Sequence, residues 1–139
     1  MRIVIDTNVF IAALLSNRGT SNRILHLIDS NLFQPIISVP LILEYEAIAS
    51  RLQPEIGLSS QTLSDILDYI SQVSYHQKVF YLWRPFLRDP KDDMVLELAI
   101  AGQAEVILTH NLRDFAGVSQ FGVELLLPID FLKRLGVLS

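Results

Sequence analysis

The chain has 139 residues, half of them hydrophobic, with a net charge of −4 and no cysteine. Its length suits one domain over residues 1–139, and the missing cysteines exclude disulfides and thiolate metal sites, as expected of a cytoplasmic protein. No apolar run reaches the ~20 residues of a membrane helix, and Asp6 and Asn8 interrupt any signal-peptide pattern, so we expect no membrane association. The acidic balance argues against a broad duplex-binding surface, while the mean hydropathy of +0.38 predicts a dimer or a protein partner.

Strand and helix patterns alternate along the whole chain. The expected elements are a strand at 2–6, a helix at 21–29, a strand at 34–38, helices at 40–52, 60–74 and 90–102, strands at 105–109 and 123–127, and a helix at 130–135. Ser21 and Asp89 are the expected N-caps of their helices, and Pro40 and Pro90 suit first helical positions. Pro54 and Gly57 break the chain between two helices, and residues 75–88 follow no clear pattern. The alternation predicts an α/β fold with a mostly parallel sheet covered by helices on both faces.

Acidic or amide side chains follow several predicted strands or begin the helices after them. In chain order these are Asp6, Glu44, Asp92, Asp93, Asn111 and Asp114. Such positions meet at the carboxyl edge of a parallel sheet, where α/β proteins bind their ligands. Clustered carboxylates repel one another unless hard cations neutralise them, and Mg²⁺ or Mn²⁺ with oxygen ligands can activate a water for phosphodiester cleavage.

Each acid also has an ordinary structural role. Asp6 could form a turn, Glu44 could simply lie early in its helix, and Asp92 could serve only to start its helix. Two other enzyme classes fit less well. A nucleotide-dependent oxidoreductase would need the Gly-rich turn that is missing here, and haloacid-dehalogenase-like phosphotransfer would need an Asp where Asn8 stands. The combination of acids therefore favours metal chemistry.

Four segments of the chain resemble the PIN domain family. They are residues 3–10, 43–45, 89–99 and 106–115. They occur in the family's order, and the resemblance extends over essentially the whole chain. It implies a three-layer α/β/α sandwich with strand order 3-2-1-4-5, and Mg²⁺- or Mn²⁺-dependent ribonuclease activity. Small stand-alone members of this kind are commonly VapC-type toxins of toxin–antitoxin pairs.

The resemblance also implies which acids hold the metal. Asp6 and Glu44 match the first two acids of the family's site. The third acid falls on Asp92 if the Asp-Pro-x-Asp pattern decides, and on Asp93 if the count back from Thr109 decides. Both alternatives stay open at the level of sequence.

The fourth acidic position of the family holds Asn111 here, which weakens a second metal site. Asp114 could compensate for this amide, or could merely orient the loop. The resemblance further implies that Thr7, Asn8 and Thr109 hydrogen-bond the carboxylates and the metal-bound water.

Substrate contacts are expected from basic and aromatic side chains near the same edge. The basic candidates are Arg18, Arg23, Arg84, Arg88, Lys91 and Arg113. Aromatic residues at 75–86 could stack on bases, but for Phe80, Trp83 and Phe86 the stronger interpretation is that they fill the core or an interface. His26 and His76 have ordinary structural interpretations, and His110 adjoins the site.

The sequence therefore predicts a Mg²⁺- or Mn²⁺-dependent endoribonuclease for single-stranded RNA, acting as a toxin. An antitoxin and a second copy of the chain are the expected protein partners, with the helices at 21–29 and 40–52 as candidate contact surfaces. The alternative is a PIN-like module that binds RNA or protein without cleaving it, which follows if Asn111 disables the metal site.

Overall fold

The structure, a computed structural model, describes residues 1–80 and 86–138. Its strands are β1 Arg2–Ile5, β2 Gln34–Ile37, β3 Tyr75–His76, β4 Val106–Leu108 and β5 Glu124–Leu126. They pair in parallel in the order β3-β2-β1-β4-β5. This confirms the predicted order 3-2-1-4-5 and makes β1 the central strand, with Ile5 opposite Leu108 of β4.

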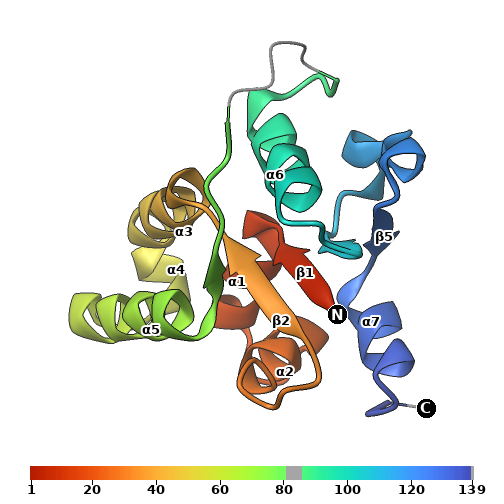
Figure 1. Ribbon diagram of the computed structural model, residues 1–139. Coiled ribbons are helices and arrows are strands. Elements are labelled where there is room, and N and C mark those ends of the chain that lie inside the picture. The colour runs from red at the N-terminus through yellow and green to blue at the C-terminus, as the bar shows by residue number, and fades with distance from the viewer. Residues whose placement is uncertain (81–85, 139) are drawn as a thin grey trace.

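Helices cover the sheet on both faces. They are α1 Thr7–Leu15, α2 Thr20–His26, α3 Val39–Arg51, α4 Gln53–Ile56, α5 Ser60–Val73, α6 Pro90–Ala101 and α7 Pro128–Arg134, with 3-10 turns η1 Leu112–Phe115 and η2 Val118–Phe121. Helix α6 packs on β1, β2 and β4, while α1 and α2 pack against the opposite face. In Figure 1 the arrowheads of β1 and β2 point toward the space between α3 and α6. Within the described residues, no helix has both the length and the apolar character to cross a bilayer.

The central strands are apolar because both of their faces are covered. Ile3, Val4 and all three residues of β4 are buried, as expected of a parallel sheet between two helical layers. A polar residue can therefore follow these strands only at the edge where the sheet ends. Asp6 and Thr109 occupy this position at the ends of β1 and β4.

The start of the chain contains a helix that the sequence pattern did not predict. Helix α1 begins at Thr7 directly after Asp6, and it is apolar on nearly all sides, so it lacks the amphipathic period on which the prediction relied. The prediction for the next helix was wrong at both ends, since α2 is capped by Gly19 and ends at His26. Ser21 lies inside α2, where its buried hydroxyl pairs with the ring of His110 instead of capping the helix.

Two further details differ from the predictions. Pro40 is the second residue of α3, because Ser38 caps this helix and Val39 begins it. Pro54 lies inside the short α4, near its start, where a missing amide hydrogen costs nothing. Strand β3 was not predicted, since a pair of exposed residues at the sheet edge is too short to show a pattern.

The predicted starts of the other two long helices are confirmed. Ser59 caps α5 by accepting a hydrogen bond from the Thr62 amide. Asp89 caps α6 by accepting one from the Lys91 amide, with Pro90 at the first position.

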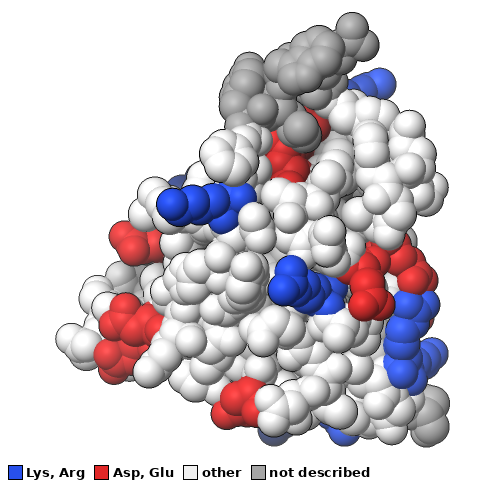
Figure 2. Space-filling view, viewed as in Figure 1, with Lys and Arg blue, Asp and Glu red and all other residues white. Residues whose placement is uncertain are grey.

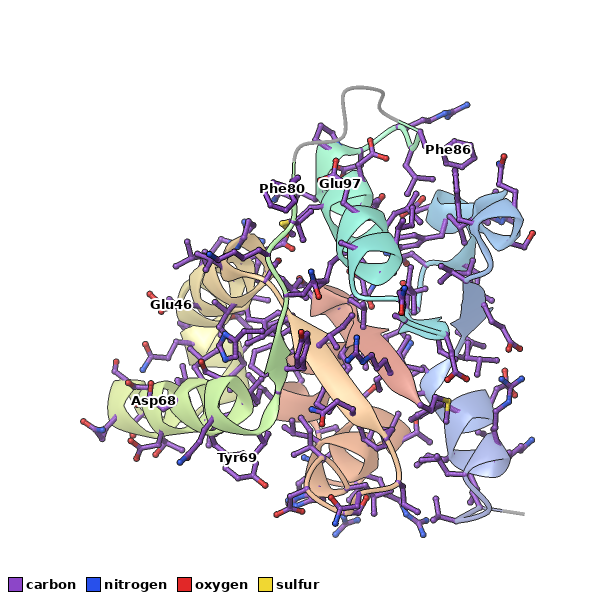
Figure 3. The ribbon with its side chains drawn as sticks, in the orientation of Figure 1. Glu46, Asp68, Tyr69, Phe80, Phe86 and Glu97 are labelled. Carbon is purple, nitrogen blue, oxygen red and sulfur yellow. The ribbon has the colours of Figure 1, made fainter. Side chains whose placement is uncertain are left out.

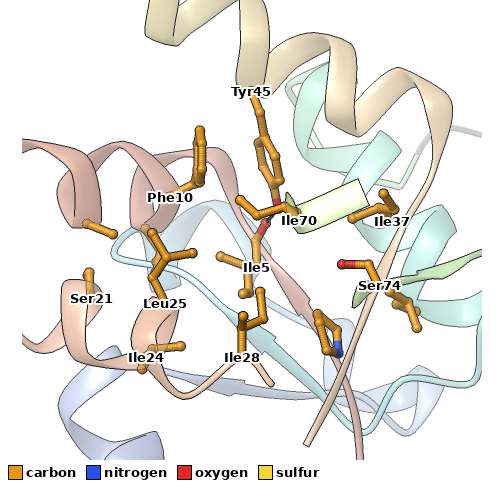
Figure 4. A pocket seen from close by; sticks show the side chains of 14 residues that line it. Ile5, Phe10, Ser21, Ile24, Leu25, Ile28, Ile37, Tyr45, Ile70 and Ser74 are labelled. Carbon is orange, nitrogen blue, oxygen red and sulfur yellow. Dashed lines mark hydrogen bonds between the residues drawn. The ribbon is translucent and has the colours of Figure 1, made fainter. Parts of the chain in front are cut away.

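The interior between α1, α2 and the sheet contains a small cavity (Figure 4). Its volume is about 20 Å³, close to the space of a single water molecule, and its walls are almost wholly apolar. Ser74 contributes to this lining. Among the described residues, its Oγ is the buried side-chain oxygen that has no hydrogen-bond partner. The lining contains no charged side chain, so the candidate chemistry lies at the edge of the sheet and not in the core.

Candidate active site

Asp6 is held at the end of β1 by the end of the neighbouring strand β4 and by the helix that it caps. Its Oδ1 accepts a hydrogen bond of 2.9 Å from the Thr7 amide, and its Oδ2 accepts one of 2.8 Å from Thr109 Oγ1. Its own amide donates to the Leu108 carbonyl oxygen at 2.9 Å. Both Asp6 and Thr109 are buried, so the carboxylate has a fixed orientation.

Two consecutive residues of α3, Glu44 and Tyr45, form hydrogen bonds at the end of β1. Thr7 Oγ1 donates a 2.7 Å hydrogen bond to Glu44 Oε2. The buried hydroxyl of Tyr45 donates to the carbonyl oxygen of Ile5, the residue before Asp6. Tyr45 was not predicted as a site residue, although its position beside Glu44 is a signal that could have identified it. Together these contacts bring Glu44 to the end of β1.

The adjacent acids Asp92 and Asp93 have different surroundings. Asp93 is buried, and its Oδ1 accepts hydrogen bonds from the amides of Phe86 at 3.2 Å and Leu87 at 2.8 Å. Asp92 is only partly buried. Partial burial, and then the negative charges around it, Asp6 first among them, raise the pKa of Asp92 to about 6.

The same electrostatic coupling includes Asp6, Glu44 and Asp114. Burial raises the pKa of Asp6, hydrogen bonds from Thr109 and Thr7 oppose this, and the charges of Glu44 and Asp114 raise it further. The charges of Asp114 and Glu44 also raise the pKa of Asp92. The structure thus brings four of the predicted acids into one electrostatic group, and it turns Asp93 toward a neighbouring backbone segment.

The polar residues predicted to support the acids form a connected set around Thr109. Asn8 Nδ2 donates to Thr109 Oγ1 at 3.4 Å, and Asn8 Oδ1 accepts from the His110 amide at 3.2 Å. The amide of Asn111 donates to the same hydroxyl at 3.0 Å. Asn111 thereby fixes the turn between β4 and η1 through its backbone, while the residue itself is exposed.

The donor set suits a hard divalent cation, although it is not a closed cage. Within residues 1–80 and 86–138, no group of three or more His, Asp or Glu side chains is placed to hold a metal ion as it stands. Mg²⁺ usually takes only one or two carboxylates and keeps several waters, so a closed cage is not required. Carboxylates that raise one another's pKa are a fitting environment for added positive charge, and their oxygens suit Mg²⁺ or Mn²⁺.

Three of the basic candidates lie beside the acids. Lys91 Nζ is 4.0 Å from Glu44 Oε1. Arg88 and Arg113 line an open cleft that also contains Asp92. These three positive charges are therefore available at the same edge of the sheet.

The other basic candidates and the histidines make different contacts or lie elsewhere. The Arg23 guanidinium donates to the Val137 carbonyl oxygen at 2.8 Å, and Arg18 is exposed before α2. His76 contacts the Ser71 carbonyl oxygen, in keeping with a structural role. Outside the described residues lie Tyr81, Trp83 and Arg84.

Phe80 and Phe86 were expected to fill the core or an interface, and the core half of this expectation is wrong. Phe80 is 84% exposed and Phe86 is 42% exposed. Figure 3 shows Phe86 reaching from the segment before α6 toward the 3-10 turns near the end of the chain. An aromatic side chain is therefore present at the surface close to the basic residues of the cleft.

Positive charge is local on the face shown in Figure 2. There the Lys and Arg side chains form separate spots with uncharged surface between them, and acidic side chains lie among them. This agrees with the net charge of −4, and it means that phosphate binding on this face would depend on a few individual side chains.

Residues 2–113 match the sequence model of the PIN domain. The chain belongs to the PIN domain family. The match contains the candidate acids from Asp6 to Asp93 and also Asn111, and it stops one residue before Asp114. No curated protein matches the chain significantly in sequence.

The PIN domain fold is also seen in a solved structure. The crystal structure of VapBC2 from Rickettsia felis, bound to a DNA fragment from its promoter, contains a similar chain with a TM-score of 0.61 and 15% sequence identity. The likeness covers 91% of this chain and 98% of that chain. At this identity it shows a shared fold.

Proposed function

We propose that this PIN domain protein is a Mg²⁺- or Mn²⁺-dependent endoribonuclease that cleaves single-stranded RNA in the cytosol. The observation that carries the proposal is the electrostatic coupling of four carboxylates at the carboxyl edge of the sheet. Asp6, Glu44 and Asp92 would hold the cation, and Asp114 would supply the charge that Asn111 lacks. A bound cation would offset charge on the phosphate and lower the pKa of a coordinated water.

The protein's own groups have separate tasks in this proposal. Thr109 and the Thr7 amide keep the Asp6 carboxylate oriented, and the Thr7 hydroxyl does the same for Glu44. Oriented ligands need no rearrangement when substrate arrives, which favours catalysis. Lys91, Arg88 and Arg113 would bind substrate phosphates.

We assign the third ligand to Asp92 and not to Asp93. One oxygen of Asp93 already accepts two backbone hydrogen bonds, from Phe86 and Leu87. Asp92, by contrast, is within the electric field of Asp6 and Glu44. The two sequence-based alternatives therefore correspond to two different roles, metal binding for Asp92 and positioning for Asp93.

The proposal is tested by incubating a mixed pool of RNAs with the protein in Mg²⁺, in Mn²⁺ and in EDTA. Asp6→Asn and Glu44→Gln should each lower cleavage at least about a hundredfold, since even residues that only support a metal ligand contribute tenfold to a hundredfold. Glu46→Gln and Asp68→Asn are matched controls, because both acids are exposed and lie away from the cleft (Figure 3). Cleavage that persists in EDTA or in Asp6→Asn contradicts the proposal.

The second candidate function is a PIN domain module that binds RNA or protein without cleaving it, and Asn111 is the observation that favours it. Calorimetric titration with Mn²⁺ separates the two candidates. Binding in the millimolar range or tighter, lost in Asp92→Asn, supports the nuclease. No binding to the folded protein, with binding gained in Asn111→Asp, supports the module.

We further propose a toxin role, with an antitoxin and a second copy of the chain as partners. Membership of the PIN domain family and the fold shared with VapBC2 support this. Val39 and Leu43 are 66% and 56% exposed at the start of α3, which makes this helix a candidate contact surface. Light scattering should give a dimer mass that Leu43→Glu reduces, whereas a monomer in both proteins contradicts the dimer.

A further inference from the structure

An open cleft lies next to the coupled acids. It has a volume of about 510 Å³, and its walls come from the segment before α6, from the first turn of α6, and from η1 with the residue after it. The lining residues are Phe86, Leu87, Arg88, Asp89, Asp92, Arg113, Asp114 and Ala116. Asp92 and Asp114 belong to both the cleft and the candidate metal centre, so an extended ligand bound in the cleft would reach that centre directly.

The two walls each contribute one arginine. Arg88 and Arg113 are both exposed, and among the described residues neither guanidinium makes an ion pair. An arginine that is not committed to a carboxylate can offer its fork of N–H donors to a phosphate. The two arginines come from different segments that line the same cleft, so a phosphate group in the cleft would have a guanidinium from each segment nearby.

Phe86 gives the cleft a partly exposed aromatic ring. Its ring meets that of Phe121 edge to face, with centroids 5.1 Å apart and an interplanar angle of 87°. Gly117 has a φ of +89°, and a Cβ there would be 3.2 Å from the Phe86 ring, so a larger residue would crowd the ring as well as strain the backbone. Phe86 is thus in contact with Phe121 and Gly117 while 42% of the residue stays exposed.

Asp93 fixes the backbone of this wall. Its buried carboxylate accepts hydrogen bonds from two successive amides, those of Phe86 and Leu87. The side chains of Phe86 and Arg88 leave the backbone on either side of Leu87, so the same carboxylate positions both of them. The wall is therefore preorganised from inside α6, next to Asp92.

We propose that this cleft is a nucleotide subsite for single-stranded RNA. The phosphate next to the scissile one binds between Arg88 and Arg113, and the attached base stacks on Phe86. The location of the scissile phosphate at Asp92 rests on the proposed function. Single strands are favoured over a duplex because only unpaired bases can turn a face toward a protein ring.

Binding is measured in an Asp6→Asn background, where the proposed function predicts cleavage at least about a hundredfold slower. A short fluorescent single-stranded RNA in Mg²⁺ serves as the probe, with anisotropy as the readout. Phe86→Ala should weaken binding about tenfold, as expected for the loss of one stacked base, and Phe86→Tyr should retain it. Arg88→Gln and Arg113→Gln should each reduce the slope of log affinity against log salt by about 0.7.

The chain offers a matched control for each change. Tyr69 is an exposed aromatic residue on α5, far from Phe86 in Figure 3, and Arg51 is an exposed arginine at the end of α3. Tyr69→Ala and Arg51→Gln should leave both affinity and salt slope unchanged. Thermal melting of every variant confirms that it is folded.

An abasic nucleotide distinguishes stacking from a general structural effect. One abasic residue is placed at successive positions of the probe. At each position, the loss of affinity that it causes is measured for the parent protein and for Phe86→Ala. Stacking predicts one position at which the abasic residue weakens binding to the parent but not to Phe86→Ala, because the two changes remove the same contact. If the abasic residue lowers the affinity equally in both proteins at every position, the stacking is wrong.

Failure of the subsite and failure of the proposed function are separate outcomes. If the wild-type protein cleaves RNA but the cleft variants bind the probe as the parent does, the subsite is wrong and the nuclease stands. If the wild-type protein cleaves nothing but these variants lose binding as stated, the cleft stands as a nucleotide-binding site and the nuclease, with the scissile phosphate at Asp92, is wrong.

Discussion

The end of β1 and the cleft wall at residues 86–88 meet at the same group of acids, but they are held in place differently. At the end of β1, Asp6 receives a hydrogen bond from the buried Thr109, and the carbonyl before it receives one from the buried Tyr45. In the cleft wall, one carboxylate, that of Asp93, accepts hydrogen bonds from two successive amides, and Phe86 and Arg88 are exposed on either side of the buried Leu87.

This difference matches two different requirements. A group that holds a reacting centre must keep its geometry within about 0.5 Å, which buried and mutually supported hydrogen bonds provide. A surface that accepts nucleotides of any sequence can tolerate adjustment, because stacking and phosphate contacts do not read base edges. The largest predicted effects therefore come from breaking the few supports of the wall, and smaller ones from loosening the strand end.

Removing the carboxylate of Asp93 should have the largest effect on stability. Asp93→Ala leaves the amides of Phe86 and Leu87 without an acceptor, and we expect about 3 kcal/mol less free energy of unfolding in urea. Asp93→Asn keeps an oxygen acceptor, so it should cost less than about 1 kcal/mol and leave Mn²⁺ affinity unchanged. If Asp93→Asn instead loses Mn²⁺ as Asp92→Asn does, Asp93 is a ligand and the assignment of roles is reversed.

Thr109→Val removes a hydroxyl from the buried strand end with almost no change in volume. Without this donor the Asp6 carboxylate loses its orientation, and Mn²⁺ affinity should fall about tenfold to a hundredfold in calorimetry. Thr109→Ser keeps the donor and should bind as the wild type does. Equal affinity for Val and wild type would mean that the orientation of Asp6 does not depend on this bond.

Tyr45→Phe tests the second support of the strand end. The variant keeps the stacking of ring 45 on Phe10 but leaves the Ile5 carbonyl without its donor, and the free energy of unfolding should fall by about 1–2 kcal/mol. RNA binding to the cleft should not change, since the cleft wall does not contact Tyr45. A loss of both together would show that the two regions are not held independently.

The pH dependence of stability tests the electrostatic environment of Asp92, which lies where the two regions meet. The pKa of Asp92 is raised from 3.8 to about 6, so the folded protein without metal binds this proton more tightly than the unfolded chain. Its contribution to stability is therefore present below the unfolded value and is lost as pH rises through about 6. Asp92→Asn should remove this loss and raise the stability of the metal-free protein above that pH by about 1 kcal/mol, allowing for solvent screening.

Thermal melts in EDTA across this pH range check the effect. In Mn²⁺ the wild type should melt at a higher temperature than Asp92→Asn, because only the wild type gains stability from binding the ion. A variant that is less stable than the wild type in EDTA at high pH would contradict the assigned environment of Asp92.

Much of the fold followed from local patterns in the sequence. Apolar runs that end in Asp6 and Thr109 indicate strands buried on both faces, because only there can a continuous apolar strand be stable. Asp89 with Pro90 gave the start of α6, because capping and proline geometry act within one turn. Helix α1 and strand β3 were missed because the first has no polar face and the second has two residues.

The sequence by itself determined which chemistry the protein could carry: an all-oxygen set of acids, spaced so that parallel strands deliver them to one edge. It could not separate Asp92 from Asp93, since consecutive residues in a helix differ in direction and only packing fixes what each one meets. Tertiary structure decided that Asp93 bonds the backbone of the cleft wall, that Asp92 is near Asp6, and that Phe86 lies at the surface. These contacts join segments distant along the chain or depend on burial, so no local pattern contains them.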